Sequence, residues 1–427
     1  MKAVLKSIIV ALLNFEARLV LWRYKPKIVG ITGSVGKTST KDAIAAVLGH
    51  NYSVRKSNKS FNSELGVPLT ILGLDTAWNN LFGWLGNLLS GFLLIVKKQK
   101  YPEWLVLEMG VDHAGDMARL ARWVRLDAAV ITRVGHLPVH VEFFPSTEAV
   151  LEEKGKILDA LRPKGDAFLA YDDEGVRALK EKTKSRVHTF GYTEDADIHA
   201  DYQETLFENG KPVGTTFKVL FEDNVAPVRI EGSVGRQFIY PILAAVSVGM
   251  AEGMNIVEIT DALVSFTTPP GRMKLLEGIR GATIIDDTYN SSPIAVAEAL
   301  LVLSSFKEFG RRIAVLGDMM ELGKFSADAH RRAGEEVAAS ADMLVAVGIR
   351  ARAIAESARS LGMTNVVTFD TSPEAGEYLK ENLKEGDIVL VKGSQFVRLE
   401  RAVAHIMKEP ARASELLVRQ GPEWDKR

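Results

Sequence analysis

A short apolar run, a glycine-rich turn and a helical pattern follow one another near the start of the chain. The segment reads KIVGITGSVGKTSTKDAI from Lys27 to Ile44. KIVGIT predicts a buried strand, and residues 38–48 predict a helix. The glycines before Lys37 and Thr38 form a compressed relative of the G-x-x-x-x-G-K-[ST] phosphate-binding loop. Glycine lets backbone N–H groups turn toward phosphate oxygens, and a helix N-terminus adds positive potential. The segment therefore predicts nucleotide binding on an α/β sheet.

Alternating strand and helix patterns predict two doubly wound units. WLVLEMG (104–110) and DAAVITRVG (127–135) continue the first unit, and residues 197–230 alternate as in an antiparallel annex. The paired prolines of TTPPGR (267–272) predict a linker. Five further strand patterns follow, and ligand-facing residues are expected at their C-terminal ends. We expect an N-terminal apolar or amphipathic helix (1–26), a central, mostly parallel α/β domain of the P-loop type with a small antiparallel annex (27–268), and a Rossmann-like α/β C-terminal domain (269–427).

Composition excludes several classes of protein. The 427 residues carry 53 basic and 54 acidic side chains, a formal net charge of −1, which disfavours nucleic acid as a partner. The absence of cysteine excludes disulfides, thiolate metal sites and cysteine nucleophiles. It also fits a reducing compartment, so we expect a cytoplasmic monomer. The sequence has no guanine-reading N-K-x-D segment, which disfavours a regulatory GTPase.

Two apolar segments raise the question of membrane contact. Residues 76–96 carry no charge and are followed by KKQK; their length permits a span, but three Asn and three Gly disfavour one. Within residues 1–24, Glu16, Arg18 and Arg23 come directly after the apolar run from Ser7 to Phe15, which disfavours a signal peptide. Both segments are expected to pack on the body or to contact a membrane surface peripherally, and residues 76–100 to form an insertion. Helical spacing predicts one apolar face made of Leu81, Trp84, Leu85, Leu88, Leu89, Phe92, Leu93 and Val96.

Polar residues near the ends of the predicted strands are the candidates for chemistry. Lys37 would reach the β- and γ-phosphates of a nucleotide, and the Thr38 hydroxyl would bind Mg²⁺. Glu108 ends the second strand pattern, where a second metal-binding carboxylate is expected. His140, in PVHVEFF, is the sharpest candidate among three neighbouring histidines, although an isolated histidine is more often structural or exposed.

Several motifs occur in an order that resembles a known family. They are GITGSVGKTST (30–40), SNKSFNSELGVPLT (57–70), LEMG (107–110), HVEFF (140–144), EEKGKIL (152–158), DDTYNSSP (286–293), VLGDMMELG (315–323) and VKGS (391–394). From about Lys27 onward the chain resembles the Mur ligase family of ATP-dependent amide-forming enzymes. DDTYN-x-x-P with LGDM-x-ELG is typical of the branch that joins D-alanyl-D-alanine to a muramoyl peptide in peptidoglycan synthesis.

The resemblance implies a set of site residues. The implied ATP-binding residues are Gly33, Ser34, Val35, Gly36, Lys37, Thr38, Ser39, Gln237, Arg272, Asp287, Tyr289 and Asn290. Lys37, Glu108, His140 and Lys154 are implied as catalytic residues, with Thr38 and Glu108 on one Mg²⁺ and His140 on a second. Lys154 matches a lysine carried as a carbamate, which requires a neutral amine and a depressed pKa. Asn62, Lys392 and Ser394 are implied substrate contacts, and Asp318 and His330 match positions with a substrate-side or structural role.

The sequence departs from the family pattern in three places. Gln237, Phe238 and Pro241 replace a histidine and two asparagines associated with adenine contacts. Lys156 stands where this branch usually has a glutamate. About 26 residues precede the first strand, which leads us to expect that the usual UDP-binding front domain is absent. A lipid-linked or otherwise modified muropeptide is then a candidate substrate.

Two alternatives to a muramoyl-peptide ligase are open. One is another amide ligase of the superfamily, of the folylpolyglutamate or amino-acid-polymer type, which the DDTYN and LGDMMELG segments disfavour. The other is a non-catalytic ATP-binding scaffold, which the joint presence of Lys37, Thr38, Glu108, His140 and Lys154 disfavours.

Overall fold

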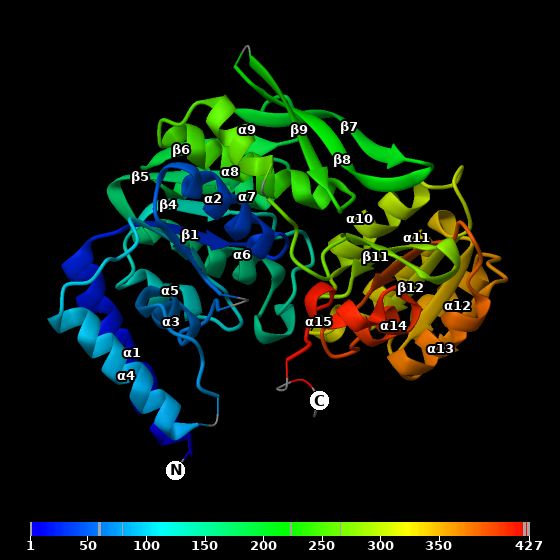
Figure 1. The fold of residues 1–427 in the computed structure, drawn as a ribbon, viewed down its shortest axis with the longest axis horizontal. Coiled ribbons are helices and arrows are strands. Elements are labelled where there is room, and N and C mark those ends of the chain that lie inside the picture. Colours follow the sequence, from blue (N-terminus) through cyan, green and yellow to red (C-terminus); the bar gives the residue numbers. More distant parts are fainter. Residues whose placement is uncertain are drawn as a thin grey trace.

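Two sheets, each covered by helices, lie next to one another in the molecule (Figure 1). The computed structural model describes residues 2–58, 61–78, 80–222, 224–264, 266–421 and 424, and for residues 2–6 it describes the backbone alone. The helices and strands of the first sheet end with α9 (Ile256–Val264), and the second sheet begins with β10 (Lys274–Glu277). The predicted linker lies between these two elements.

The first sheet has nine strands in the order β2-β3-β1-β4-β5-β6-β7-β8-β9. Neighbours from β2 to β7 are parallel, and β7, β8 and β9 are antiparallel. This confirms the predicted parallel sheet with an antiparallel annex. Its strands are β1 (Lys27–Thr32), β2 (Val54–Lys56), β3 (Trp104–Glu108), β4 (Leu126–Ile131), β5 (Leu161–Ala170), β6 (Arg186–Gly191), β7 (Ile198–Glu208), β8 (Lys211–Phe221) and β9 (Asn224–Glu231).

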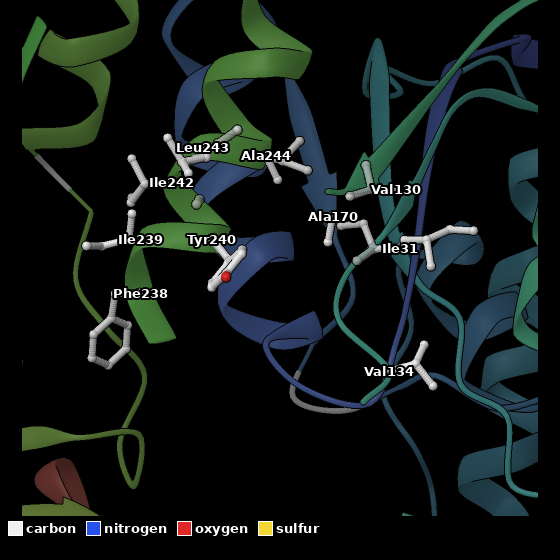
Figure 2. Packing of buried hydrophobic residues seen from close by; sticks show 14 of the residues in the cluster. Ile31, Val130, Val134, Ala170, Phe238, Ile239, Tyr240, Ile242, Leu243 and Ala244 are labelled. Carbon is white, nitrogen blue, oxygen red and sulfur yellow. The ribbon is translucent and has the colours of Figure 1, made fainter. Parts of the chain in front are cut away.

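The core of this part lies between the sheet and two apolar helices. The first is α2 (Lys37–Asn51), which follows the glycine-rich turn, and the second is α8 (Ile239–Ala251), which is buried along most of its length. Figure 2 shows core side chains of α8 and of β1, β4 and β5. The middle residues of β1, β3 and β4 are buried on both faces, so polar groups that could meet a ligand lie at the ends of these strands. The other helices of this part are α3 (Gly66–Leu72), α5 (Asp116–Ala121), α6 (Thr147–Gly155) and α7 (Glu174–Ala178).

The second sheet has six strands in the order β10-β11-β15-β12-β13-β14, and all pairs except β10 with β11 are parallel. This confirms the predicted second doubly wound α/β unit. Its later strands are β11 (Thr283–Asp287), β12 (Arg312–Gly317), β13 (Met343–Val347), β14 (Val366–Phe369) and β15 (Ile388–Lys392). Its helices are α10 (Pro293–Ser304), α11 (Ser326–Ser340), α12 (Arg352–Ser360), α13 (Ser372–Asn382), α14 (Glu400–Ile406) and α15 (Ala413–Leu416).

Two helices form a pair at the end of the molecule farthest from the second sheet: α1 (Lys2–Tyr24) and α4 (Leu81–Val96) (Figure 1). Among the described residues, no helix combines the length and the apolar character that crossing a bilayer requires. The predicted single apolar face of α4 is partly wrong. Trp84 is buried and Leu88 half-buried, whereas Phe82, outside the predicted face, is 84% exposed.

Candidate active site

The glycine-rich turn joins β1 to α2 at the C-terminal edge of the first sheet. Gly33 has φ 142°, and a Cβ there would lie 1.9 Å from Thr132 Oγ1, so only glycine fits. Gly36 has φ 86° and caps α2 without a side-chain hydrogen bond. The N–H groups of Ser34 and Val35 both donate to the carbonyl of Arg133, at 2.9 and 3.1 Å. Phosphate contacts would therefore come from the first turn of α2 rather than from these two N–H groups.

A hydroxyl, a carboxylate and an amide meet behind the loop. Thr38 Oγ1 donates to Glu108 Oε2 at 2.9 Å, and Asn62 Nδ2 lies 3.4 Å from Glu108 Oε1. Glu108 is 2% exposed at the end of β3, which is hydrogen-bonded next to β1. Hard oxygen donors in this arrangement suit Mg²⁺, so the residues fit the implied metal. The described residues contain no ready-made cluster of three histidine or acidic ligands, so phosphate oxygens and water would complete the shell.

Two lysines point at one backbone carbonyl. Lys37 Nζ donates to the oxygen of Gly33 at 2.9 Å, and Lys154 Nζ, from α6, donates to the same oxygen at 3.2 Å. Burial lowers the pKa of Lys37, although Glu108 opposes the shift. Burial, reinforced by the charge of Lys37, lowers the pKa of Lys154 to about 7. Lys154 is thus a partly neutral amine at the phosphate loop, as carbamate formation requires.

His140 joins the two halves of the molecule. Its Nδ1 lies 2.8 Å from Glu321 Oε2, and its Nε2 lies 3.5 Å from Asp112 Oδ1. The bond from His140 lowers the pKa of Glu321. His140 and Glu321 have φ angles of 68° and 64°, a conformation that costs energy in residues other than glycine. Such strain tends to occur where a side chain must be aimed at a ligand or a partner.

The second sheet contributes a group of residues that faces the phosphate loop. Arg272 Nη2 donates to Thr38 Oγ1 at 2.9 Å, and the guanidinium lies 4.0 Å from the centre of the Tyr289 ring. Lys392 Nζ, at the end of β15, donates to Asp287 Oδ2 at 2.6 Å and to the carbonyl of Asn290 at 2.9 Å. The charged residues after the linker therefore reach the loop on β1 and α2.

One pocket lies between the two parts of the chain. Most of the implied nucleotide residues line it, and Gln237 Oε1 and Ser34 Oγ are buried there without a hydrogen-bond partner in the described chain. A polar ligand would satisfy both atoms. The lining residues are Ser34, Val35, Gly36, Ser39, Val139, Gln237, Phe238, Arg272, Asp287, Tyr289, Asn290, Ser291, Ser292, Ala295, Glu298 and Lys392.

The remaining predicted residues lie outside this lining. Ser394 is buried, with its N–H bonded to the carbonyl of Asp318 and its hydroxyl unpaired within the described chain. His330 is fully buried, donates from Nδ1 to the carbonyl of Ser326 at 2.7 Å and accepts from Met319 N–H at Nε2. Burial lowers the pKa of His330, so its contacts are those of a neutral structural residue.

Two features of the site were not predicted from the sequence. Arg133 forms a bidentate pair with Glu298 of α10 and lies over the Tyr240 ring, with 4.1 Å between Cζ and the ring centre. The second is the pairing of Glu321 with His140. Glu321 belongs to VLGDMMELG and Arg133 follows β4, so both stood at positions where ligand-facing residues are expected. Nothing in the sequence indicated their partners.

Fold and geometry together define a class: a two-domain α/β protein in which a phosphate-type loop faces charged residues of a second doubly wound domain. Comparison with known proteins narrows this class. The family model described as "Mur ligase middle domain" matches residues 31–82 and 87–249. The family model described as "Mur ligase, glutamate ligase domain" matches residues 271–395. The chain belongs to the Mur ligase family.

Individual relatives are similar over most of the chain. A UDP-N-acetylmuramoyl-tripeptide–D-alanyl-D-alanine ligase of Bacillus subtilis is 29% identical over 397 residues, which are 92% of this chain and 79% of that protein. The protein of the same name from Mycobacterium tuberculosis is 31% identical over 390 residues, covering 86% of this chain and 70% of the relative.

Solved structures show the same fold. A MurF ligase of Thermotoga maritima in complex with ADP has a TM-score of 0.77 and 28% identity, covering 95% of this chain and 84% of that one. A MurF structure from Acinetobacter baumannii has a TM-score of 0.77 and 25% identity, with 93% and 80% covered.

Proposed function

We propose that this protein is an ATP-dependent amide ligase of peptidoglycan precursor synthesis, which joins a muramoyl-peptide carboxylate to D-alanyl-D-alanine or a similar amine. One observation carries the proposal: charged groups of the second domain meet the phosphate loop. Arg272 bonds to Thr38, which bonds to Glu108, while Lys392 and Asp287 line the same pocket. The named relatives with this architecture support the choice of reaction.

The first step is phosphoryl transfer to the substrate. A carboxylate oxygen attacks the γ-phosphorus, the bond to the bridging oxygen breaks, and ADP leaves with the electron pair, which gives an acyl phosphate. Carboxylate and phosphate repel one another, so positive groups must offset their charge. Lys37, which bonds to the Gly33 carbonyl, and Arg272, which bonds to Thr38, supply such charge. Mg²⁺ at Thr38 and Glu108, with a second ion at His140, would add the metal's charge neutralisation when bound.

The second step is amide formation. The amine nitrogen attacks the acyl carbon, phosphate leaves from the tetrahedral intermediate, and the nitrogen loses a proton to solvent. Water competes with the amine for the acyl phosphate, so the two domains must close over it. The pairs Arg133–Glu298 and His140–Glu321 join the two domains in this structure. Lys392 lies on the second-domain side of the pocket, where the incoming amine would meet the acyl group.

Lys154 is part of the proposal as a carbamate. Its buried neutral amine would attack carbon dioxide and release a proton, which leaves an anionic group beside the phosphate loop. Lys156, which replaces the expected glutamate, pairs with Glu153 at 2.6 Å, and Glu153 in turn accepts from the N–H of Met117 in α5. Lys156 therefore pairs with the carboxylate that links α6 to α5 instead of adding an acid to the site.

Substrate recognition is proposed in two respects. The unpaired Oε1 of Gln237, at the end of the pocket near Phe238, would contact the adenine base in place of the usual asparagines. Peripheral contact of residues 1–24 and 76–96 with the inner face of a membrane would bring the enzyme to a lipid-linked muropeptide. Equal rates on soluble UDP-muramoyl peptides and on lipid-linked ones, without vesicles, would contradict this part.

A phosphate-release screen tests the reaction. Purified protein with ATP and Mg²⁺ receives several muramoyl peptides crossed with dipeptide and amino-acid acceptors. The proposal predicts phosphate release that requires both a muramoyl tripeptide and D-alanyl-D-alanine or a close analogue. Release that requires a pteroyl glutamate would favour the folylpolyglutamate-type alternative. ATP binding without turnover on any pair would favour a non-catalytic scaffold.

A further inference from the structure

The helices α1 and α4 run side by side in the same direction. The Tyr24 hydroxyl, at the end of α1, donates to the carbonyl of Leu94 near the end of α4 at 3.0 Å, and its ring stacks on Tyr101 at 4.5 Å. Further along, the carboxyl group of Glu16 lies directly against Gly91 of α4, where a Cβ would meet Oε2 at 2.2 Å. The C-terminal ends of both helices therefore lie together.

Each of the two helices has one buried and one exposed apolar face. Leu13, Ala17 and Val20 of α1 are fully buried, while other apolar residues of both helices face solvent. More than half of the large exposed apolar side chains in the described chain belong to this pair and the turn before α4. Soluble proteins rarely expose so many together without a partner. These residues, called here the apolar ridge, are Ile8, Leu12, Phe15, Trp22, Trp78, Leu81, Phe82, Leu85, Leu89, Phe92, Leu93 and Val96.

A cluster of cations stands at the C-terminal end of the apolar ridge. Its members, called here the basic cluster, are Arg23, Lys25, Lys97, Lys98 and Lys100, and all are exposed. Arg18, earlier in α1, is also exposed and lies over the Trp123 ring, 5.4 Å from its centre. Residues 1–25 and 74–100 together contain eight Lys or Arg and two acidic residues, an excess of six positive charges in a chain whose net charge is −1. One of the two acids, Glu16, is half-buried with its Oε2 atom enclosed, and burial raises its pKa to about 7. The helix pair is therefore the positive part of an otherwise acidic molecule.

We propose that the apolar ridge and the basic cluster form a docking surface for a bilayer that contains anionic lipid. Apolar side chains would enter the boundary between headgroups and acyl chains, and the cations would meet lipid phosphates. Exposed Trp22 and Trp78 are the aromatic type that favours this boundary. An apolar partner protein or a second copy would use the ridge but would gain nothing from the basic cluster beside it, which favours the anionic surface. The surface lies at the end of the molecule opposite the second domain, so docking leaves the domain interface accessible (Figure 1).

Vesicle binding tests the proposal with the full chain. Vesicles of phosphatidylcholine with phosphatidylglycerol are compared with pure phosphatidylcholine by co-flotation, with tryptophan fluorescence as a second readout. We expect binding to the anionic vesicles, a blue shift of tryptophan emission, and binding that weakens as salt rises. Flotation that is absent with anionic vesicles overturns the proposal.

Matched variants test whether vesicle binding depends on the apolar ridge or on any exposed apolar side chain. Phe82→Glu with Leu89→Glu should lower the vesicle-binding constant by roughly tenfold or more. Val257→Glu with Val264→Glu, on the exposed side of α9, is the control and should leave binding unchanged. Lys97→Gln, Lys98→Gln and Lys100→Gln together should remove most of the preference for anionic vesicles. Equal losses in the ridge and α9 variants would overturn the proposal.

The oligomeric state in solution tests the alternative that a second copy of the chain covers the apolar ridge. A chain that is dimeric without vesicles, and becomes monomeric in the Phe82→Glu, Leu89→Glu variant, would show that a second copy covers the ridge and would overturn the proposal. The inference deepens the membrane contact in the proposed function, and it does not depend on the ligase reaction. Phosphate release from soluble substrates by the Phe82→Glu, Leu89→Glu variant tests the proposed ligase reaction. Flotation with vesicles tests the docking surface, so one proposal can fail while the other holds.

Discussion

The phosphate-loop site and the helix pair α1–α4 use side chains in opposite ways. At the site, charged groups are buried and nearly all have partners: Thr38 with Glu108 and Arg272, and Lys392 with Asp287. In the helix pair, large apolar side chains are exposed to solvent in the described part of the chain. A buried charge requires a nearby counter-charge, and the charged groups named here find theirs within the chain. An exposed apolar surface is stabilised by something outside the chain.

Loss of the loop lysine should have the largest effect. Lys37→Ala removes the charge that offsets phosphoryl transfer, so we expect kcat to fall by about a thousandfold or more. Phosphate release with saturating substrates measures this effect. Because the side chain is half-buried, a thermal unfolding curve must accompany the assay. Lys41→Met, in the same helix, serves as a control for loss of a buried lysine. Comparable activity of Lys37→Ala and the wild-type chain would show that the loop does not carry the reaction.

Lys154 should give the next largest effect. Lys154→Met keeps the volume but removes the amine, and we expect at least about a hundredfold loss of kcat because a charge near the reacting groups is lost. In the wild-type chain the pKa of Lys154 is lowered to about 7, so the neutral amine that forms a carbamate predominates above that pH. Activity should therefore fall as pH drops below about 7, and added bicarbonate should restore part of it.

A control residue lies two positions away. Lys156→Met changes an amine on the same segment that is 43% exposed and pairs with Glu153. Activity and its bicarbonate response should change little in this variant. An unchanged bicarbonate response in Lys154→Met would contradict a carbamate at that position.

Two adjacent leucines of α1 test the contrast within one helix. Leu13 is fully buried and Leu12 is 44% exposed on the apolar ridge. Leu13→Ala should lower the free energy of unfolding by roughly 2–3 kcal/mol, whereas Leu12→Ala should change it by less than about 0.5 kcal/mol. Urea denaturation without lipid measures both. Similar losses for the two variants would show that the outer face of α1 is covered in solution.

Glu321 should give a smaller effect that tests domain closure. In Glu321→Gln the carboxylate that faces His140 Nδ1 becomes neutral, which weakens the contact between the domains and the orientation of the imidazole that we propose for the second metal. We expect about a tenfold weaker affinity for Mn²⁺ bound with ADP, measured by calorimetry. Glu335→Gln, on the exposed side of α11, is the control. An unaltered Mn²⁺ affinity would place His140 and Glu321 outside the metal site.

The same contrast explains what could be predicted from the sequence. The strand before Gly33 and the residues Lys37, Thr38 and Glu108 were predictable because they lie at fixed places on adjacent strands and a helix. The sheet orders were predictable only as a class, because pairing such as β15 between β11 and β12 depends on contacts far apart in the chain. The partners Arg133–Glu298 and His140–Glu321 were not predictable, because they form only when two domains meet.

The helix pair shows a different limit. Spacing predicted that α4 is a helix with an apolar face, but nearly every position of α4 is apolar, so periodicity could not say which face packs inward. In the structure, the side of α4 that contains Gly91 packs against Glu16 of α1. Trp84 lies on this inner side and is buried, whereas Phe82 is exposed to solvent. That choice depends on α1, which ends at Tyr24, whereas α4 begins only at Leu81.

Isotope transfer tests the central claim most directly. A muramoyl tripeptide whose terminal carboxylate carries heavy oxygen is incubated with the protein, ATP, Mg²⁺ and D-alanyl-D-alanine, and the released phosphate is analysed by mass spectrometry. If the carboxylate attacks the γ-phosphate, one heavy oxygen atom must appear in each phosphate formed with the amide product. Phosphate that contains only light oxygen would show that the carboxylate is not phosphorylated and would contradict the proposed reaction.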